Sequence, residues 1–115
     1  MKGATGPVRR FFVAVLAVTA VGSVDPSLKV ADLVIPDQII DYTYGREHTF
    51  HEDELVHIDL TYPYDDAFRA ELIHCAEQLQ DVPGVWSGVY GCTQGPRLET
   101  AAEIKRLYKD GCTIV

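Results

Sequence analysis

The chain has 115 residues, of which 47% are apolar and 23% are charged, which fits one globular α/β or α+β domain. Its 10 basic and 17 acidic residues give a net charge of −7, which argues against nucleic acid as a general partner. Anionic small substrates stay possible, because backbone amides bind them without net positive charge. The three cysteines are widely spaced without a CxxC pair, which indicates free thiols in a reducing cytoplasm rather than disulfides or a zinc site.

The N-terminal region has two interpretations. Basic residues at Lys2, Arg9 and Arg10 precede an apolar run over 11–21, which is the layout of a secretory signal peptide. The same run is rich in β-branched and aromatic residues, which equally predicts a buried strand over 12–19. It is too short to span a membrane as a helix. The elements that follow favour the strand.

The middle of the chain predicts a strand, a loop and a helix. A second strand is expected over 33–40, interrupted at Pro36. A long polar and aromatic loop over 42–63 follows and holds three of the four histidines. Asp65 or Asp66 is expected to cap the next helix. That helix presents an apolar stripe at helical spacing, formed by Phe68, Leu72, Cys75, Ala76 and Leu79.

The last third predicts a strand, a turn, a helix and the start of a further strand. The strand covers 86–93 and is loosened by two glycines, and the turn covers 94–97. Thr100 and Glu103 form a capping box that begins a helix through Tyr108, and Gly111 suits its C-terminal cap. Residues 112–115 begin the next strand. Strands that alternate with helices indicate βαβ units and a largely parallel sheet.

Three segments together resemble a known enzyme family. They are Ala17-Val18-Thr19-Ala20-Val21-Gly22-Ser23, Leu33-Val34-Ile35-Pro36-Asp37-Gln38-Ile39-Ile40-Asp41-Tyr42-Thr43, and Gly88-Val89-Tyr90-Gly91-Cys92-Thr93-Gln94-Gly95-Pro96-Arg97-Leu98-Glu99-Thr100. Each is weak alone, but their order and spacing resemble the trimeric purine nucleoside phosphorylases, including the methylthioadenosine and methylthioinosine phosphorylases.

This resemblance covers 13–115 and implies a mixed, largely parallel sheet flanked by helices in a Rossmann-like three-layer fold. Residues 1–11 do not match, and 12–115 would be the central part of a phosphorylase domain. A glycine-rich phosphate loop upstream and the residues that assist the leaving purine downstream have no counterpart here. The resemblance therefore implies a fragment of an enzyme, inactive alone. It also implies a cytoplasmic homotrimer that uses inorganic phosphate as co-substrate. Neither a cofactor nor a metal is expected to take part, and neither a membrane nor a nucleic acid is an expected partner.

Small residues follow the first expected strand, at the end of a parallel sheet where α/β folds bind ligands. A threonine hydroxyl and exposed amides can hold phosphate oxygens there. By resemblance, Thr19 and Ala20 contact phosphate, and Gly22 lets the purine approach the backbone. The residues alone describe an ordinary small-residue turn equally well.

Glu99 is the most informative residue. By itself, a carboxylate here would stabilise the N-terminus of the following helix through its negative charge. The resemblance instead places it against the purine, where a carboxylate accepts the N1–H of a 6-oxopurine and repels the N1 lone pair of adenine. The adenine-preferring relatives carry serine at this position. By the same resemblance Leu98 packs on the base, although it could equally be a core residue.

Further candidates stand on weaker patterns. The segment Val56-His57-Ile58 resembles the stretch by which one subunit of a methylthioadenosine phosphorylase lines the 5′-methylthio pocket of its neighbour. His57 is equally well a half-buried loop histidine. Tyr62 and Tyr64 would pack at the same subunit interface. The acidic and histidine residues of 47–54 lack metal-ligand spacing and indicate a solvated loop. Arg97 suits either a phosphate contact or a surface salt bridge.

Two functions follow from these patterns. The first is phosphorolysis of 5′-methylthioinosine, or another 6-oxopurine nucleoside, to the free purine and a pentose 1-phosphate. The alternative is a small secreted binding protein whose first 23 residues are a signal peptide.

Overall fold

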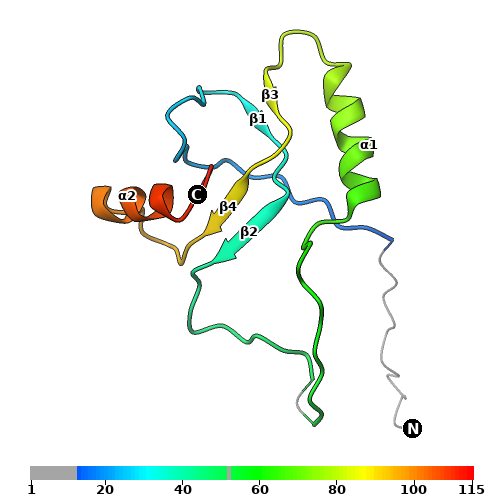
Figure 1. Cartoon of the computed structure of the whole chain (residues 1–115), viewed down its shortest axis with the longest axis vertical. Coiled ribbons are helices and arrows are strands. Elements are labelled where there is room, and N and C mark those ends of the chain that lie inside the picture. Colours follow the sequence, from blue (N-terminus) through cyan, green and yellow to red (C-terminus); the bar gives the residue numbers. More distant parts are fainter. Residues whose placement is uncertain (1–12, 52) are drawn as a thin grey trace, which may run out of the picture.

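The computed structural model describes residues 13–51 and 53–115, so the predicted segment 1–11, Phe12 and Glu52 lie outside the described residues. Along the described chain run β1 (Leu33–Val34), β2 (Gln38–Asp41), α1 (Asp66–Glu77), β3 (Gly84–Val85), β4 (Val89–Cys92) and α2 (Ala101–Lys109) (Figure 1). Strand β1 pairs with β3 and β2 pairs with β4, both in parallel. This alternation with parallel pairing confirms the predicted α/β class.

The strand predicted over 33–40 is divided in two, and the strand predicted over 86–93 is shorter than expected. Pro36, which has no N–H to donate, separates β1 from β2, as its presence in the predicted strand suggested. Of the strand predicted over 86–93, β4 confirms the part from Val89 to Cys92, and β3 precedes the predicted range. Gly88 has a φ of +155°, and a Cβ there would lie 2.9 Å from the Thr113 hydroxyl oxygen, so the break on this side requires glycine.

A guanidinium from α1 fills the divided part of the sheet. Arg69 Nε donates to the carbonyl of Pro36 at 2.8 Å, and Nη2 donates to Ile35 at 3.2 Å and Trp86 at 2.6 Å. Carbonyls left without ladder partners at the break are thereby satisfied by one side chain. The same contacts fix α1 against both pairs of strands.

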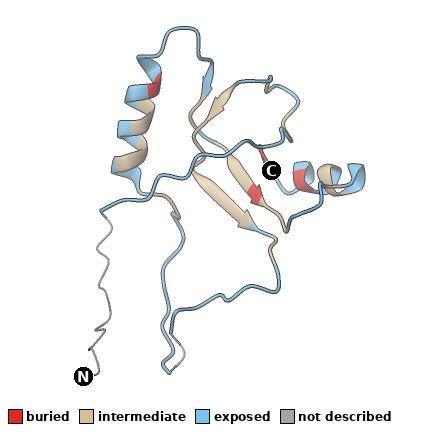
Figure 2. Cartoon of the chain, turned by 180° about the vertical axis from the view of Figure 1, so that it is seen from behind, coloured by how far each residue is buried: buried red, intermediate tan, exposed pale blue. Residues whose placement is uncertain are grey.

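Helix α1 begins as predicted, because the Asp65 side chain accepts a hydrogen bond of 2.7 Å from the backbone N–H of Phe68. The predicted buried stripe is only partly correct. Ala76 is buried, whereas Cys75 is exposed and Leu79 keeps 55% of its surface in solvent (Figure 2). In the described part of the chain, no segment covers the outer side of this helix end.

Helix α2 has both predicted ends. Thr100 accepts from the N–H of Glu103, and the Glu103 carboxylate accepts from the N–H of Thr100, which confirms the capping box. At the other end Gly111 has a φ of +88°, and the N–H groups of Gly111 and Cys112 donate back to the carbonyls of Tyr108 and Leu107. These contacts form a Schellman motif, which needs glycine in the left-handed conformation.

The predicted buried strand over 12–19 is wrong within the described residues. Residues 13–21 have no regular structure and are exposed, with Val13 fully accessible and Val18 at 85%. Such a strand is buried only when neighbouring strands and helices cover it, and none of the described residues does so. Pairing starts later, where Ser23 bridges Ile114 antiparallel and Ile114 bridges Tyr90 in parallel. The predicted final strand is thus a single bridging residue.

A small core surrounds this pairing. Val24, Leu107 and Cys112 are buried together, and Ile40, Tyr42, Val89, Ile104 and Val115 pack around them. In the predicted loop over 42–63, the described residues 42–51 and 53–63 have no regular structure and extend away from the strands (Figure 1). In the described residues, no helix is long and apolar enough to cross a membrane.

Candidate functional site

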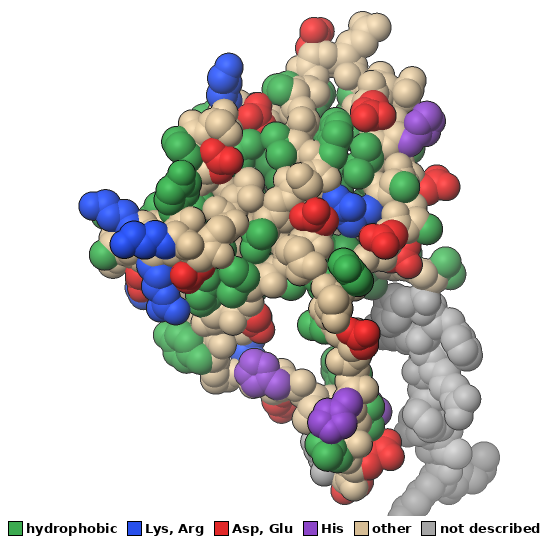
Figure 3. Space-filling model, viewed as in Figure 1, with side chains coloured by type: hydrophobic (Ala, Val, Ile, Leu, Met, Phe, Trp, Pro, Cys, Tyr) green, Lys and Arg blue, Asp and Glu red, His purple; other side chains and the backbone are tan. Residues whose placement is uncertain are grey.

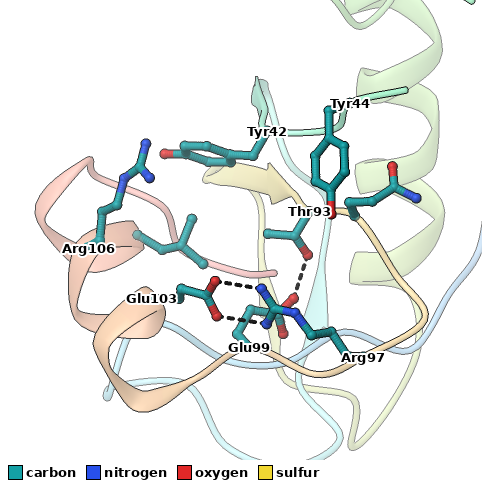
Figure 4. A pocket seen from close by; sticks show the side chains of 9 residues that line it. Tyr42, Tyr44, Thr93, Arg97, Glu99, Glu103 and Arg106 are labelled. Atoms are coloured by element: carbon teal, nitrogen blue, oxygen red, sulfur yellow. Dashed lines mark hydrogen bonds and ion pairs between the residues drawn. The ribbon is translucent and has the colours of Figure 1, made fainter. Parts of the chain in front are cut away.

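A hollow of about 280 Å³ lies where β2 and β4 end and α2 begins (Figure 4). It combines aromatic rings, two acids and two arginines that come from the loops after β2 and β4 and from α2. Its lining residues are Tyr42, Tyr44, Thr93, Gln94, Arg97, Glu99, Glu103, Arg106 and Leu107. The carboxyl ends of parallel strands are where α/β folds bind small molecules, so this hollow is the candidate site.

Glu99 is half-buried in the wall of this hollow. The Thr93 hydroxyl donates a hydrogen bond of 2.5 Å to Glu99 Oε1. Oε2 accepts no hydrogen bond from the residues that the structure describes. Thr93 directly follows β4, so the end of a strand holds one oxygen of the carboxylate while the other remains an acceptor for a ligand.

Both carboxylate oxygens of the second acid, Glu103, accept hydrogen bonds from the protein itself. Arg97 donates two hydrogen bonds to its carboxylate, of 2.7 and 2.9 Å, and the Thr100 N–H donates a third of 2.7 Å. The hydrogen bond from Arg97, followed by that from the Thr100 backbone, lowers the pKa of Glu103 to about 2. Of the two roles predicted for Arg97, the structure therefore contains the salt bridge, with 62% of the arginine side chain exposed.

Tyr42 forms the other wall and is fixed from α2. Its hydroxyl donates to Asp110 Oδ2 at 2.8 Å, and Arg106 Cζ lies 5.3 Å from the ring centroid. Partial burial, followed by the hydrogen bond to Asp110, raises the pKa of Tyr42. Arg106 belongs to the group of basic side chains over α2 (Figure 3). The hollow thus has a cationic and aromatic side facing its acidic side.

The residues predicted to bind phosphate lie elsewhere in the structure. Gly22 exchanges backbone hydrogen bonds of 2.7 and 2.9 Å with Val115, and Thr19 and Ala20 are exposed before it. Two bridges, Ser23 to Ile114 and Ile114 to Tyr90, separate this segment from β4. None of Thr19, Ala20 and Gly22 lines the hollow.

The other predicted site residues are also outside the hollow. Leu98 is 87% exposed and is not a core residue. His57 is exposed in the loop between β2 and α1. Tyr62 is 77% exposed, whereas partial burial raises the pKa of Tyr64. Of the residues that the family resemblance places at the substrate, Glu99 alone lies in the hollow, beside Arg97, which its salt bridge occupies.

Sequence reasoning missed the residues that surround Glu99. In the sequence, Tyr42 begins the predicted loop and Thr93 ends a predicted strand, and neither position is predicted to bind a ligand. A usable signal was present for Thr93, since a hydroxyl side chain directly after a strand is held at the ligand-binding edge of a parallel sheet. Within residues 13–51 and 53–115, no group of three histidine, cysteine or acidic side chains could hold a metal ion.

The parallel strands, the flanking helices and the hollow at the strand ends define an α/β protein of the kind that binds small molecules at this edge of its sheet. The chain belongs to the phosphorylase superfamily, whose family model matches residues 9–115. That match includes the apolar run that the alternative function assigned to a signal peptide, so the comparisons give that alternative no support.

Among curated proteins, this chain is most usefully compared with two relatives within the family. The chain is 49% identical over 105 residues to a protein of Pseudomonas syringae pv. tomato named probable S-methyl-5′-thioinosine phosphorylase, a match that covers 89% of this chain and 42% of that protein. It is 44% identical over 99 residues to the 6-oxopurine nucleoside phosphorylase of Pyrococcus furiosus, covering 79% of this chain and 37% of that enzyme. The chain thus spans less than half the length of these relatives.

Solved structures give the same fold. A doubly substituted variant of the adenosine/methylthioadenosine phosphorylase from Schistosoma mansoni, without ligand, superposes with a TM-score of 0.76 at 25% identity, over 84% of this chain and 42% of that one. The ligand-free methylthioadenosine phosphorylase from the same organism has a TM-score of 0.74 at 24% identity, over 83% and 41%. These likenesses confirm the predicted partial phosphorylase fold.

Proposed function

We propose that this chain provides the base-selecting part of a purine nucleoside phosphorylase that acts on 5′-methylthioinosine or another 6-oxopurine nucleoside. The observation that carries the proposal is the half-buried Glu99 carboxylate in the hollow, with one oxygen held by Thr93 and the other unoccupied by the described residues. The names of the Pseudomonas and Pyrococcus relatives support the same substrate class.

The chemistry of the base explains why a carboxylate selects it. A 6-oxopurine presents an N1–H donor, which Glu99 accepts. Adenine presents a lone pair at N1, which faces the carboxylate oxygen without a proton between them. Leaving a buried acceptor unpaired costs about 1–3 kcal/mol, which corresponds to a discrimination of about 5- to 150-fold.

The proposed reaction is phosphorolysis. An oxygen of inorganic phosphate attacks C1′ of the ribosyl group, the C1′–N9 bond breaks, and the departing purine takes the bonding electron pair and a proton. The ribosyl group passes through an oxocarbenium-like state, which a nearby anion stabilises electrostatically. Thr19 and Ala20 are proposed to contact the phosphate, and Gly22 and Leu98 the purine. The reaction requires no metal or organic cofactor.

The proposal extends to the assembly and its location. His57 would line the 5′-substituent pocket of a neighbouring subunit in a homotrimer, and the exposure of the loop that carries it leaves it available for such a contact. Salvage of purine nucleosides takes place in the cytoplasm, where the three free cysteines of this chain would stay reduced.

The test compares the chain alone with a completed protein. We expect the 115-residue chain to show no measurable phosphorolysis of 5′-methylthioinosine, with host phosphorylases excluded. A chimera in which residues 12–115 replace the matched part of the Pseudomonas relative should cleave 6-oxopurine nucleosides in preference to adenine nucleosides, measured as kcat/KM.

Glu99→Ser in this chimera should reduce that preference about 5- to 150-fold. Glu77→Ser, which changes an exposed acid at the end of α1, is the matched control and should leave the preference unchanged. An unchanged preference in Glu99→Ser would remove Glu99 from the base site, and robust turnover by the 115-residue chain alone would contradict its proposed role as only a part of the active site.

A further inference from the structure

The contact between Thr93 and Glu99 restricts what the candidate site can bind. An ionised carboxylate has no proton to give, so the hydroxyl proton of Thr93 must lie on the hydrogen bond to Oε1. The hydroxyl can then offer only lone pairs to a ligand, and Oε2 can do the same. The side chains of Thr93 and Glu99 therefore present acceptors and no donors to the hollow.

Thr93 is placed firmly enough to impose this arrangement. It follows Cys92, the last residue of β4, whose carbonyl accepts a hydrogen bond of 2.8 Å from Tyr42 at the end of β2. Two adjacent strand ends are thus joined directly before Thr93. Glu99 lies six residues further on, in the loop before α2, and depends on Thr93 for its only hydrogen bond in the described part of the chain.

A competing partner for Glu99 lies two residues away. Arg97 is a cation in the wall of the same hollow. Its hydrogen bonds to Glu103 and the charge of that residue raise the pKa of Arg97, and Tyr44 and Glu99 contribute less. The two hydrogen bonds to Glu103 hold the guanidinium on the helix. Without the Thr93 hydroxyl, nothing described on the strand side would keep Glu99 from turning toward that guanidinium.

We propose that Thr93 is a positioning residue that sets base selection, because its hydroxyl holds the Glu99 carboxylate toward the ligand and away from Arg97. This inference rests on the proposed function, since it assumes that the hollow receives a purine. It adds that selection between a ring N–H and a ring lone pair depends on two side chains, of which only Glu99 meets the base.

The test measures binding of hypoxanthine and adenine to the full 115-residue chain by ligand-observed NMR. Thr93→Val removes the hydroxyl and keeps the shape, whereas Thr93→Ser keeps the hydroxyl. We expect the original chain and Thr93→Ser to prefer hypoxanthine, and Thr93→Val to lose that preference by about tenfold, the value of one hydrogen bond to a charged group. Thr43→Val, at the half-buried position after β2, is the matched control and should keep the preference.

A second substitution separates positioning from a merely structural role. Adding Arg97→Gln to Thr93→Val removes the competing cation, so we expect part of the preference for hypoxanthine to return. Loss of folding would not be repaired in this way, and the thermal midpoint of each variant shows whether the fold is intact.

The outcomes distinguish this inference from the proposed function. Preference for hypoxanthine in the original chain with an unchanged preference in Thr93→Val overturns the role of Thr93 alone. Absence of binding of both bases to the original chain overturns the base site itself, and the inference with it. Loss of preference in Thr93→Val without recovery in the double variant overturns the competition with Arg97.

Discussion

Gly91 allows a sharp test of how the core is packed. It lies in β4, and a Cβ at this position would be 2.9 Å from Cys112 Sγ and 3.3 Å from Leu107 Cδ2. Both neighbours are buried, each with 3% of its surface exposed, so neither can move aside freely. Gly91→Ala should therefore lower the free energy of unfolding by about 1–3 kcal/mol, as expected for overpacking.

The identity of the obstructing atom makes this prediction testable in a double-mutant cycle. Cys112→Ala removes Sγ and should cost about 1 kcal/mol through lost apolar burial. In that background the new methyl group of Gly91→Ala occupies the space of the missing sulfur. The double variant should then be about 1–2 kcal/mol more stable than the sum of the single losses predicts.

Urea unfolding followed by far-UV circular dichroism measures each free energy. Cys75→Ala, at an exposed position of α1, is the matched control and should change stability little. If Gly91→Ala costs the same with and without Cys112→Ala, the sulfur does not limit the packing at this position and the reasoning is refuted.

Three further predictions concern the helices. The pKa of Glu103 is about 2 rather than 4.5, so the stability that its ionised form contributes is present above pH 4.5 and is lost as the pH falls toward 2. Glu103→Gln can still cap the helix, and it should remove this pH dependence, as measured by circular dichroism at 222 nm. Gly111→Ala should destabilise the chain by about 1 kcal/mol, because its φ of +88° disfavours a Cβ, and an unchanged urea midpoint would contradict this. Asp65→Ala should cost about 1 kcal/mol by removing the cap on Phe68, and Asp65→Ser should recover most of that loss in the same assay.

Local signals in the sequence predicted local structure well. The capping box of Thr100 and Glu103, the cap at Asp65 and the glycine at position 111 all depend on residues within a few positions of each other, and all three are confirmed. Pro36 likewise interrupts a strand because its own ring removes the donor.

Features that depend on distant residues could not be predicted in the same way. The run over 12–19 has the composition of a buried strand, but composition does not state whether another segment covers it, and residues 13–21 are exposed. The hydrogen bond from Tyr42 to Asp110 joins residues 68 positions apart, and no local sequence pattern predicts it. Glu99 was identified through family resemblance, whereas its partner Thr93 becomes visible only when the strand end and the loop are placed together.

The contacts of Arg69 have a mechanical consequence. The ladder is interrupted between the two strand pairs, so the joint between them depends on the Arg69 side chain, which reaches three carbonyls. Beside it lie only the backbone hydrogen bonds, within the described residues, from Ile35 to Val85 and from Asp37 and Gln38 to Gly88. Guanidinium stays protonated at every pH at which proteins fold, and its planar fork cannot be reproduced by an ammonium group. The half containing β1 and β3 should therefore open as its own cooperative unit in hydrogen exchange, earlier than the half containing β2 and β4, and Arg69→Lys should widen the difference between their protection factors.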